Sequence, residues 1–239
     1  MFNFLRRLRR SLIESLSVRK YLLYAIGEIA LVVIGILIAL QINNWNEWRK
    51  ERKLEKEILT DIQLNLESNM SVLEGRISYF DRGQKAGEII LDLIEKRLPY
   101  HDSLGVHFSR ATRGYGGADV ISYVGYESLR NNGFNIIINK SLRDEILNLF
   151  ETTYRSIISF DETFKLQNSY HKDVVGRLLY MDKPSSLKPF DFEELVGSPR
   201  YYSSVSDHHY NYQWMKAETI AGLEETKRVL ELVKDELDE

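Results

Sequence analysis

Cysteine is absent from this chain of 239 residues, and proline occurs only four times. The lack of cysteine excludes disulfides, thiolate metal sites and cysteine nucleophiles. The prolines stand at positions 99, 184, 189 and 199, so two stretches of 98 and 84 residues contain none. Because proline breaks helix interiors, such long stretches without it favour an all-α fold.

The chain also has no strong excess of one charge. It contains 32 lysine and arginine residues and 35 aspartate and glutamate residues, which gives a net charge of −3. Without a basic excess we expect no nucleic-acid partner. The chain lacks Gly-x-Ser-x-Gly, His-Glu-x-x-His and a phosphate-binding loop ending in Gly-Lys-Ser/Thr. The sequence therefore predicts no catalytic residue, no metal site and no cofactor, and the protein is interpreted as a non-enzyme.

Charged residues are scarcest between positions 21 and 42. Glu28 is the only lysine, arginine, aspartate or glutamate in this stretch. Twenty-two residues of helix extend about 33 Å, which matches a hydrocarbon core of about 30 Å. We therefore expect a transmembrane helix over residues 21–43 that acts as an uncleaved signal anchor. Aromatic rings that prefer the headgroup level stand at both of its ends: Tyr21, Tyr24, Trp45 and Trp48.

The flanks of the span predict its orientation. Residues 1–20 carry leucines at 5, 8, 12 and 16 and arginines at 6, 7, 9 and 10, which is typical of a basic amphipathic helix on an anionic leaflet. An ordinary basic flank is the alternative. Basic residues beyond the span alternate with glutamates at 47, 51, 55 and 57. We expect a single-pass protein of the bacterial inner membrane, with a cytoplasmic N-terminus and residues 44–239 in the periplasm.

Glu28 is the most unusual residue of the span, because a carboxylate in lipid usually faces a partner, water or an ion path. Gly35 and Ala39 follow at spacings of seven and eleven, which places them on the same helix face. Small residues four apart allow helices to approach closely. This face predicts an interface with a second copy or another membrane subunit. The alternative is that Glu28 reaches the headgroups or pairs with Lys20.

Apolar residues beyond the span repeat every three or four positions, which predicts three long amphipathic helices. The first covers 54–98, with a kink or turn at residues 81–83. The second runs from about 139–141 to about 180, and the third begins near 206–207, with Tyr210, Trp214, Ala217 and Ala221 on its apolar side. Because such stripes must be buried against each other, we expect an extramembrane antiparallel helical bundle.

The connections between these helices are shorter. A loop with a short helix is expected over residues 99–125, followed by helical turns at 126–131 that end at Asn132-Gly133. Pro184 and Pro189 predict a loop, and residues 192–196 predict a short helix.

Two stretches carry a family resemblance. The runs YAIGEIALVVIGILIALQINNWNE (24–47) and YESLRNNGFNIIINKSLRDEILNLFETTY (126–154) resemble two signatures of an uncharacterised membrane-protein family of Bacteroidota, a domain of unknown function. The resemblance implies a single-span protein with a helical extramembrane domain. It implies no activity.

The histidines and a group of aromatic residues leave alternatives open. None of the histidines at 101, 107, 171, 208 and 209 has a metal-binding spacing, so we expect them on the surface or as satisfied polar groups. The aromatic side chains of Tyr201, Tyr202, Tyr210, Tyr212 and Trp214 fit either the bundle core or a partner surface.

The leading functional hypothesis is a non-enzymatic, membrane-anchored scaffold or interaction module of the bacterial cell envelope. Its partners would be the lipid bilayer and either a second copy or another membrane subunit. The alternative is a membrane-tethered hydrolase with a site built from His101, His107, His208 and acidic residues. That alternative requires these side chains to meet in one pocket.

Overall fold

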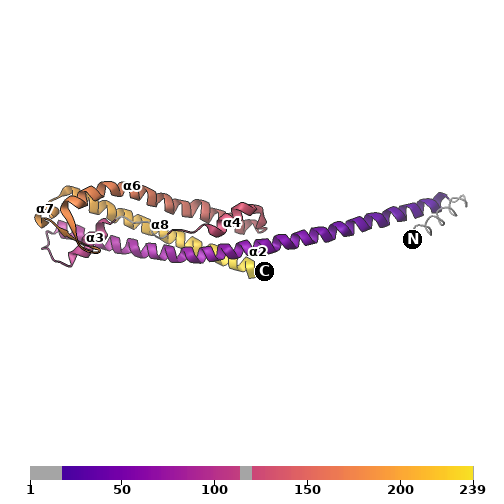
Figure 1. Ribbon diagram of the computed structural model, residues 1–239, viewed down its shortest axis with the longest axis horizontal. Coiled ribbons are helices and arrows are strands. Elements are labelled where there is room, and N and C mark those ends of the chain that lie inside the picture. Colours follow the sequence, from indigo (N-terminus) through magenta and orange to yellow (C-terminus); the bar gives the residue numbers. More distant parts are fainter. Residues whose placement is uncertain (1–17, 114–119, 239) are drawn as a thin grey trace. The chain divides into compact units, whose positions relative to one another are not determined.

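The computed structural model describes residues 18–113 and 120–238, and helices dominate these ranges (Figure 1). The prediction of an all-α fold is confirmed, with one short hairpin added. The chain divides into an N-terminal unit that ends at Leu54 and a compact unit that begins at Glu55. Most of the amphipathic segment expected over 1–20 lies outside the described residues.

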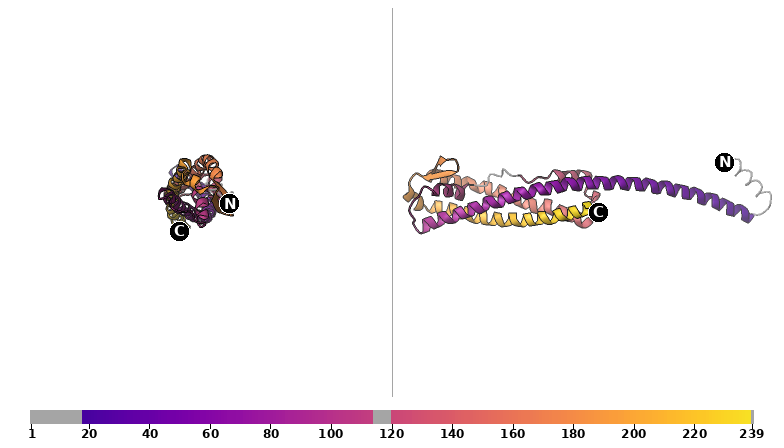
Figure 2. Two further views of the ribbon diagram at one scale, coloured as in Figure 1. Left: turned by 90° about the vertical axis from the view of Figure 1, so that its left-hand side faces the viewer. Right: turned by 90° about the horizontal axis from the view of Figure 1, so that it is seen from below.

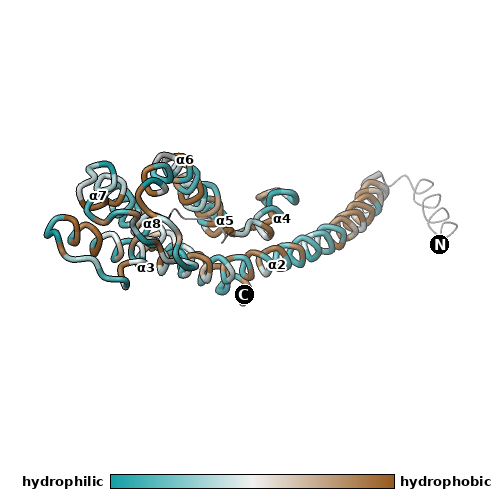
Figure 3. The backbone as a smooth tube through the Cα atoms, turned by 60° about the vertical axis from the view of Figure 1, so that its left-hand side comes forward, coloured by the Kyte–Doolittle hydropathy of each residue, from teal (hydrophilic) through white to brown (hydrophobic). Residues whose placement is uncertain are grey.

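Helix α2, Val18–Glu95, begins with the apolar stretch that the sequence singles out. Residues 26–42 are exposed throughout, and this part of α2 is almost uniformly hydrophobic along the tube in Figure 3. The helix is long and apolar enough to cross a membrane. An apolar helical surface that the chain itself leaves uncovered is compatible with a single-pass membrane protein.

The later part of α2 buries one stripe in the compact unit, including Ile58, Leu66, Leu73 and Ile90. The kink or turn expected at residues 81–83 is wrong, because the helix continues unbroken to Glu95. Gly83 instead leaves room for a neighbouring helix: a Cβ there would lie 2.6 Å from Cε2 of Tyr212. The glycine therefore serves close helix packing.

The chain then returns along the compact unit through three short elements. These are α3 (Leu104–Thr112), α4 (Val124–Asn132) and the 3-10 turn η1 (Phe134–Ile136). Helix α4 ends where Asn132-Gly133 predicts, and Gly133 has a φ of 90°. The loop with a short helix and the helical turns at 126–131 are thus confirmed for the described residues.

The second long helix begins as predicted, with the Asn139 side chain accepting a hydrogen bond from the backbone N–H of Leu142. It consists of α5 (Lys140–Asn148), one π-helical turn η2 (Leu149–Thr153) and α6 (Tyr154–Leu178). Arg76 of α2 contacts Asp161, and Ile90 shares a cluster with Val174. The later residue of α2 thus lies beside the later residue of α6, so the two helices run parallel in the compact unit.

The loop predicted between Pro184 and Pro189 is wrong in part, because strands β1 (Leu179–Lys183) and β2 (Ser186–Pro189) form an antiparallel hairpin there. Its turn places Ser185 at a φ of 63°. The short helix at 192–196 is confirmed as α7 (Phe192–Val196), and the Asp191 side chain caps it by accepting from the Glu194 N–H.

The last helix, α8 (Pro199–Asp238), starts seven residues before the predicted 206–207. Proline suits a first helical position, and the Ser198 hydroxyl accepts from the N–H of Tyr201 at 3.3 Å. The expected apolar side of its first half is also wrong, because Tyr210, Trp214, Ala217 and Ala221 are exposed. The helix packs antiparallel to α2 and α6, as Figures 1 and 2 show.

The core of the compact unit lies between the three long helices. A cluster at one end joins α2, α3, α6, α7 and α8 through residues such as Ile90, Phe108, Val174, Leu195 and Tyr201. A smaller cluster farther along contains Phe80, Phe164, Tyr212 and Met215. Burial of these stripes makes the three long helices one packed body.

Candidate functional site

The residues predicted to form a transmembrane interface lie on the exposed first part of α2. Glu28, Gly35 and Ala39 are all exposed, and a Cβ added at Gly35 would meet no atom within 4 Å. Because α2 is continuous here, spacings of seven and eleven keep the three residues on one face. No other described part of the chain covers this face.

The predicted membrane anchors occupy the two ends of the same segment. Trp45 and Trp48 are exposed, and Tyr24 is half-buried, whereas the side chain of Tyr21 is not described. The Arg49 guanidinium lies 5.7 Å from the centre of the Trp45 ring. A cation over an indole ring at this end fits the headgroup level of a membrane.

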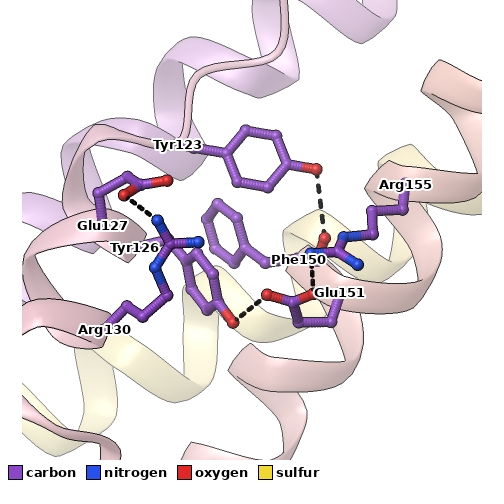
Figure 4. A network of polar contacts seen from close by, with 7 residues as sticks. All are labelled: Tyr123, Tyr126, Glu127, Arg130, Phe150, Glu151 and Arg155. Carbon is purple, nitrogen blue, oxygen red and sulfur yellow. Dashed lines mark hydrogen bonds and ion pairs between the residues drawn. The ribbon is translucent and has the colours of Figure 1, made fainter.

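In the compact unit, the second signature stretch folds into a network between α4 and the π-helical turn (Figure 4). The Tyr126 hydroxyl donates to Oε1 of Glu151 at 2.6 Å, and Arg155 pairs with the same carboxylate at 2.6 Å. The rings of Tyr126 and Phe150 stack with centroids 4.6 Å apart. The Tyr123 hydroxyl donates to the Phe150 carbonyl at 3.2 Å.

The π-helical turn carries part of this network. Its neighbouring residues Leu149 and Phe150 are both buried, and Glu151 follows them directly. Glu225 of α8 accepts hydrogen bonds from Asn148 and Thr153, one before the turn and one at its end. The turn is therefore held from both sides.

Two asparagines of α2 hold the segment before α4. The Asn69 side chain exchanges two hydrogen bonds with the Ser122 backbone, at 2.7 and 3.0 Å. The Asn65 amide donates to the Ser122 hydroxyl at 2.9 Å, and its carbonyl accepts from the Gly125 N–H at 2.5 Å. We call Asn65, Asn69, Ser122 and Gly125 the asparagine clasp.

Burial shifts the phenol groups around this region. Burial, and then the hydrogen bond to Glu151, raise the pKa of Tyr126. Burial raises the pKa of Tyr154 to about 12, although its hydroxyl lies 2.9 Å from that of Thr226. These phenols stay neutral at physiological pH, and their polar groups pair within the chain. The arrangement therefore suits a structural joint between α4, the π-helical turn and α8.

The histidines do not form the site that a hydrolase would need. His101 is exposed and contacts Ser103, and His107 lies half-buried on α3. His208 is buried on α8, where its ring contacts His171 with centroids 4.5 Å apart. Within residues 18–113 and 120–238, no three histidine, aspartate or glutamate side chains could hold a metal ion together.

The aromatic residues at 201–214 lie on different faces of α8 and do not form one group. Tyr201 and Tyr212 are buried, whereas Tyr202, Tyr210 and Trp214 are exposed. Two of the five rings therefore belong to the core, and three are exposed.

Sequence reasoning missed the asparagine clasp and the π-helical turn. A signal for the clasp existed, because Asn65 and Asn69 are spaced by four on a stripe of otherwise apolar residues. The sequence predicts a regular helix through residues 149–153, and nothing in its periodicity marks Leu149–Thr153 as π-helical.

Comparison with known proteins adds one finding. Residues 28–85 match a family of unknown function, DUF6090. The match runs from Glu28 to Lys85 and contains both asparagines of the clasp. No curated protein and no solved structure matches the chain.

Proposed function

We propose that this protein is a non-enzymatic, membrane-anchored interaction module of the bacterial cell envelope whose span associates with the span of a second copy. The observation that carries the proposal is the first part of α2, an apolar helix that is exposed on every side and holds one carboxylate. Such a surface needs lipid around it, and the carboxylate needs a polar contact within the lipid.

The face of Glu28, Gly35 and Ala39 supplies that contact in a symmetric pair. Lipid gives apolar helices no hydrophobic reason to associate, so packing and hydrogen bonds must stabilise a complex. Gly35 and Ala39 lower the steric cost of approach, and Glu28 places a hydrogen-bonding group on the same face. The compact unit adds a rigid helical body for partners, and its described histidines give no support to a hydrolase.

The location follows from the charged flanks. Four arginines stand close together before the span, whereas the basic residues after it alternate with glutamates. The rule that positive charge stays inside then puts the N-terminus in the cytoplasm and the compact unit in the periplasm of an inner membrane.

Self-association is tested by mass photometry of the full chain in nanodiscs. We expect the wild type to be oligomeric and Gly35→Ile to be monomeric, because the larger side chain blocks close approach. Glu28→Gln should weaken the oligomer less, since an amide still forms hydrogen bonds.

The matched control is Ala30→Ile, which adds similar bulk about 140° away around the helix. It should leave the oligomer intact. A monomeric wild type, or equal effects of the substitutions at 30 and 35, would contradict the proposed interface.

A further inference from the structure

A cavity of about 470 Å³ opens in the compact unit between α3, α6 and the hairpin. Its polar lining includes Ser109, Thr112, Arg113, Lys165, Asn168 and Lys172. A second cavity of about 220 Å³ shares Ser109, Arg113 and Ser185 with the first and adds Arg82 and Arg110. We call the two together the basic cavity, because they share a wall.

Among the described residues, no acidic side chain balances the charge of the basic cavity. Five cations line it, and none of the residues lining either part is acidic. No carboxylate in the described ranges pairs with any of the five. Nearby, Lys85 and Lys216, which do not line the cavity, both pair with Asp81. All five residues are exposed, and an anion bound among them would relieve the repulsion between their like charges.

Neutral hydrogen-bonding groups stand among these cations. Ser109 is 7% exposed, and its hydroxyl can both donate and accept a hydrogen bond. Asn168 is 9% exposed, and its side-chain carbonyl oxygen is buried without a partner. Buried polar groups are nearly always hydrogen-bonded, so the unpartnered amide oxygen of Asn168 is an exception in the wall of this cavity, and a small rotation of the amide would turn it towards a ligand.

The walls of the basic cavity are held in place from behind. The backbone carbonyl of Arg113 accepts hydrogen bonds from the hydroxyls of Tyr79, at 2.9 Å, and of Tyr212. Gly105 of α3 lies so close to Ser186 that any side chain there would collide with the hairpin. Pre-formed walls reduce the cost of ordering residues on binding.

We propose that the basic cavity binds a small organic anion that carries a phosphate group. A phosphate monoester has a charge near −2 at neutral pH and three acceptor oxygens. Arg113, Lys165 and Lys172 supply the opposing charges, and the Ser109 hydroxyl supplies a further donor. The apolar side of the cavity is formed by Val175, Met181 and Leu187, which suits the organic part of the ligand. A volume of this size fits a small molecule.

Titration calorimetry on the full chain in a neutral maltoside detergent tests this site, with phenyl phosphate as the probe and ionic strength held constant with sodium chloride. We expect saturable binding that weakens about tenfold or more in Lys165→Gln/Lys172→Gln, because two charged hydrogen bonds are lost. Lys140→Gln is the matched control, since this exposed lysine of α5 also has no described carboxylate partner but does not line the cavity. It should bind like the wild type.

The other probes separate the parts of the proposal. Inorganic phosphate should bind more weakly than phenyl phosphate, and equal affinity would overturn the role of the apolar wall. Citrate that binds where phenyl phosphate does not would overturn the phosphate assignment. Absence of binding, or equal loss in the Lys140→Gln control, would overturn the site itself.

Discussion

The surroundings of His208 change its acid–base chemistry. It is fully buried on α8, its Nδ1 lies 2.9 Å from the Ser204 carbonyl, and the His171 ring is its neighbour. Burial lowers the pKa of His208 to about 4, and the adjacent His171 lowers it further while the Ser204 contact opposes the shift. Burial also lowers the pKa of His171, although Asp207 acts in the opposite direction.

This pair predicts acid-sensitive stability. In the unfolded chain a histidine gains its proton near pH 6.5, whereas folded His208 remains neutral until about pH 4. The unfolded state therefore binds more protons between these values, and stability falls as the pH drops from about 6.5 towards 4. The loss from His208 alone is on the order of 3 kcal/mol.

Melting of the full chain between pH 7.5 and pH 4.5 checks this expectation. His208→Gln should flatten the pH dependence, because the substituted side chain does not titrate. His101→Gln removes an exposed histidine and should leave the dependence as it is. A steep loss of stability that persists in His208→Gln would assign the acid sensitivity to other groups.

At the scale of elements, the contact between α4 and α2 depends on a glycine, which has no side chain. Gly125, the second residue of α4, lies against the backbone of α2, and a Cβ there would lie 2.7 Å from the carbonyl carbon of Asp61. Neither backbone can yield without breaking the asparagine clasp, because the N–H of Gly125 donates to Asn65. The glycine and the two asparagines thus form one joint.

Gly125→Ala should therefore destabilise the compact unit by about 1–3 kcal/mol, the usual cost of overpacking. Chemical denaturation of the full chain measures the change. Gly176→Ala is the matched control, because a Cβ at that helical position of α6 meets nothing within 4 Å. It should be neutral or stabilising by up to about 1 kcal/mol. Equal losses at both positions would show that the clasp does not set the approach of α4.

At the scale of the whole molecule, the surfaces of the two units suit different solvents. The N-terminal part of α2 is exposed and apolar, and the compact unit hides its apolar stripes within a bundle. A chain of this kind is expected to place one unit in lipid and the other in water.

Reporter fusions test the proposed orientation of the chain. Alkaline phosphatase fused to the C-terminus should be active, because the compact unit is proposed to be periplasmic. A fluorescent protein fused to the C-terminus should be exported with the compact unit and should therefore be dark. The same reporters at the N-terminus should show the opposite pattern and serve as the control. Active phosphatase at the N-terminus alone would reverse the orientation.

Local physical rules account for what the sequence by itself determined. The apolar run, the 3–4 periodicity of the long helices, the cap at Asn139 and the stop at Gly133 each depend on neighbouring residues only, and the structure confirms the helices they predict. The early start of α8 also has a local signal, because Ser198-Pro199 places a capping hydroxyl before a proline at the first helical position.

Tertiary structure decided the features that depend on residues distant in the chain. Gly83 and Gly125 look like helix weaknesses until the Tyr212 ring and the Asp61 backbone occupy the space beside them. The π-helical turn forms because packing on α4 and hydrogen bonds to Glu225 stabilise it. The basic cavity arises from cations on α2, α3 and α6 that lie far apart in sequence, and no periodicity within one helix can show that such charges converge.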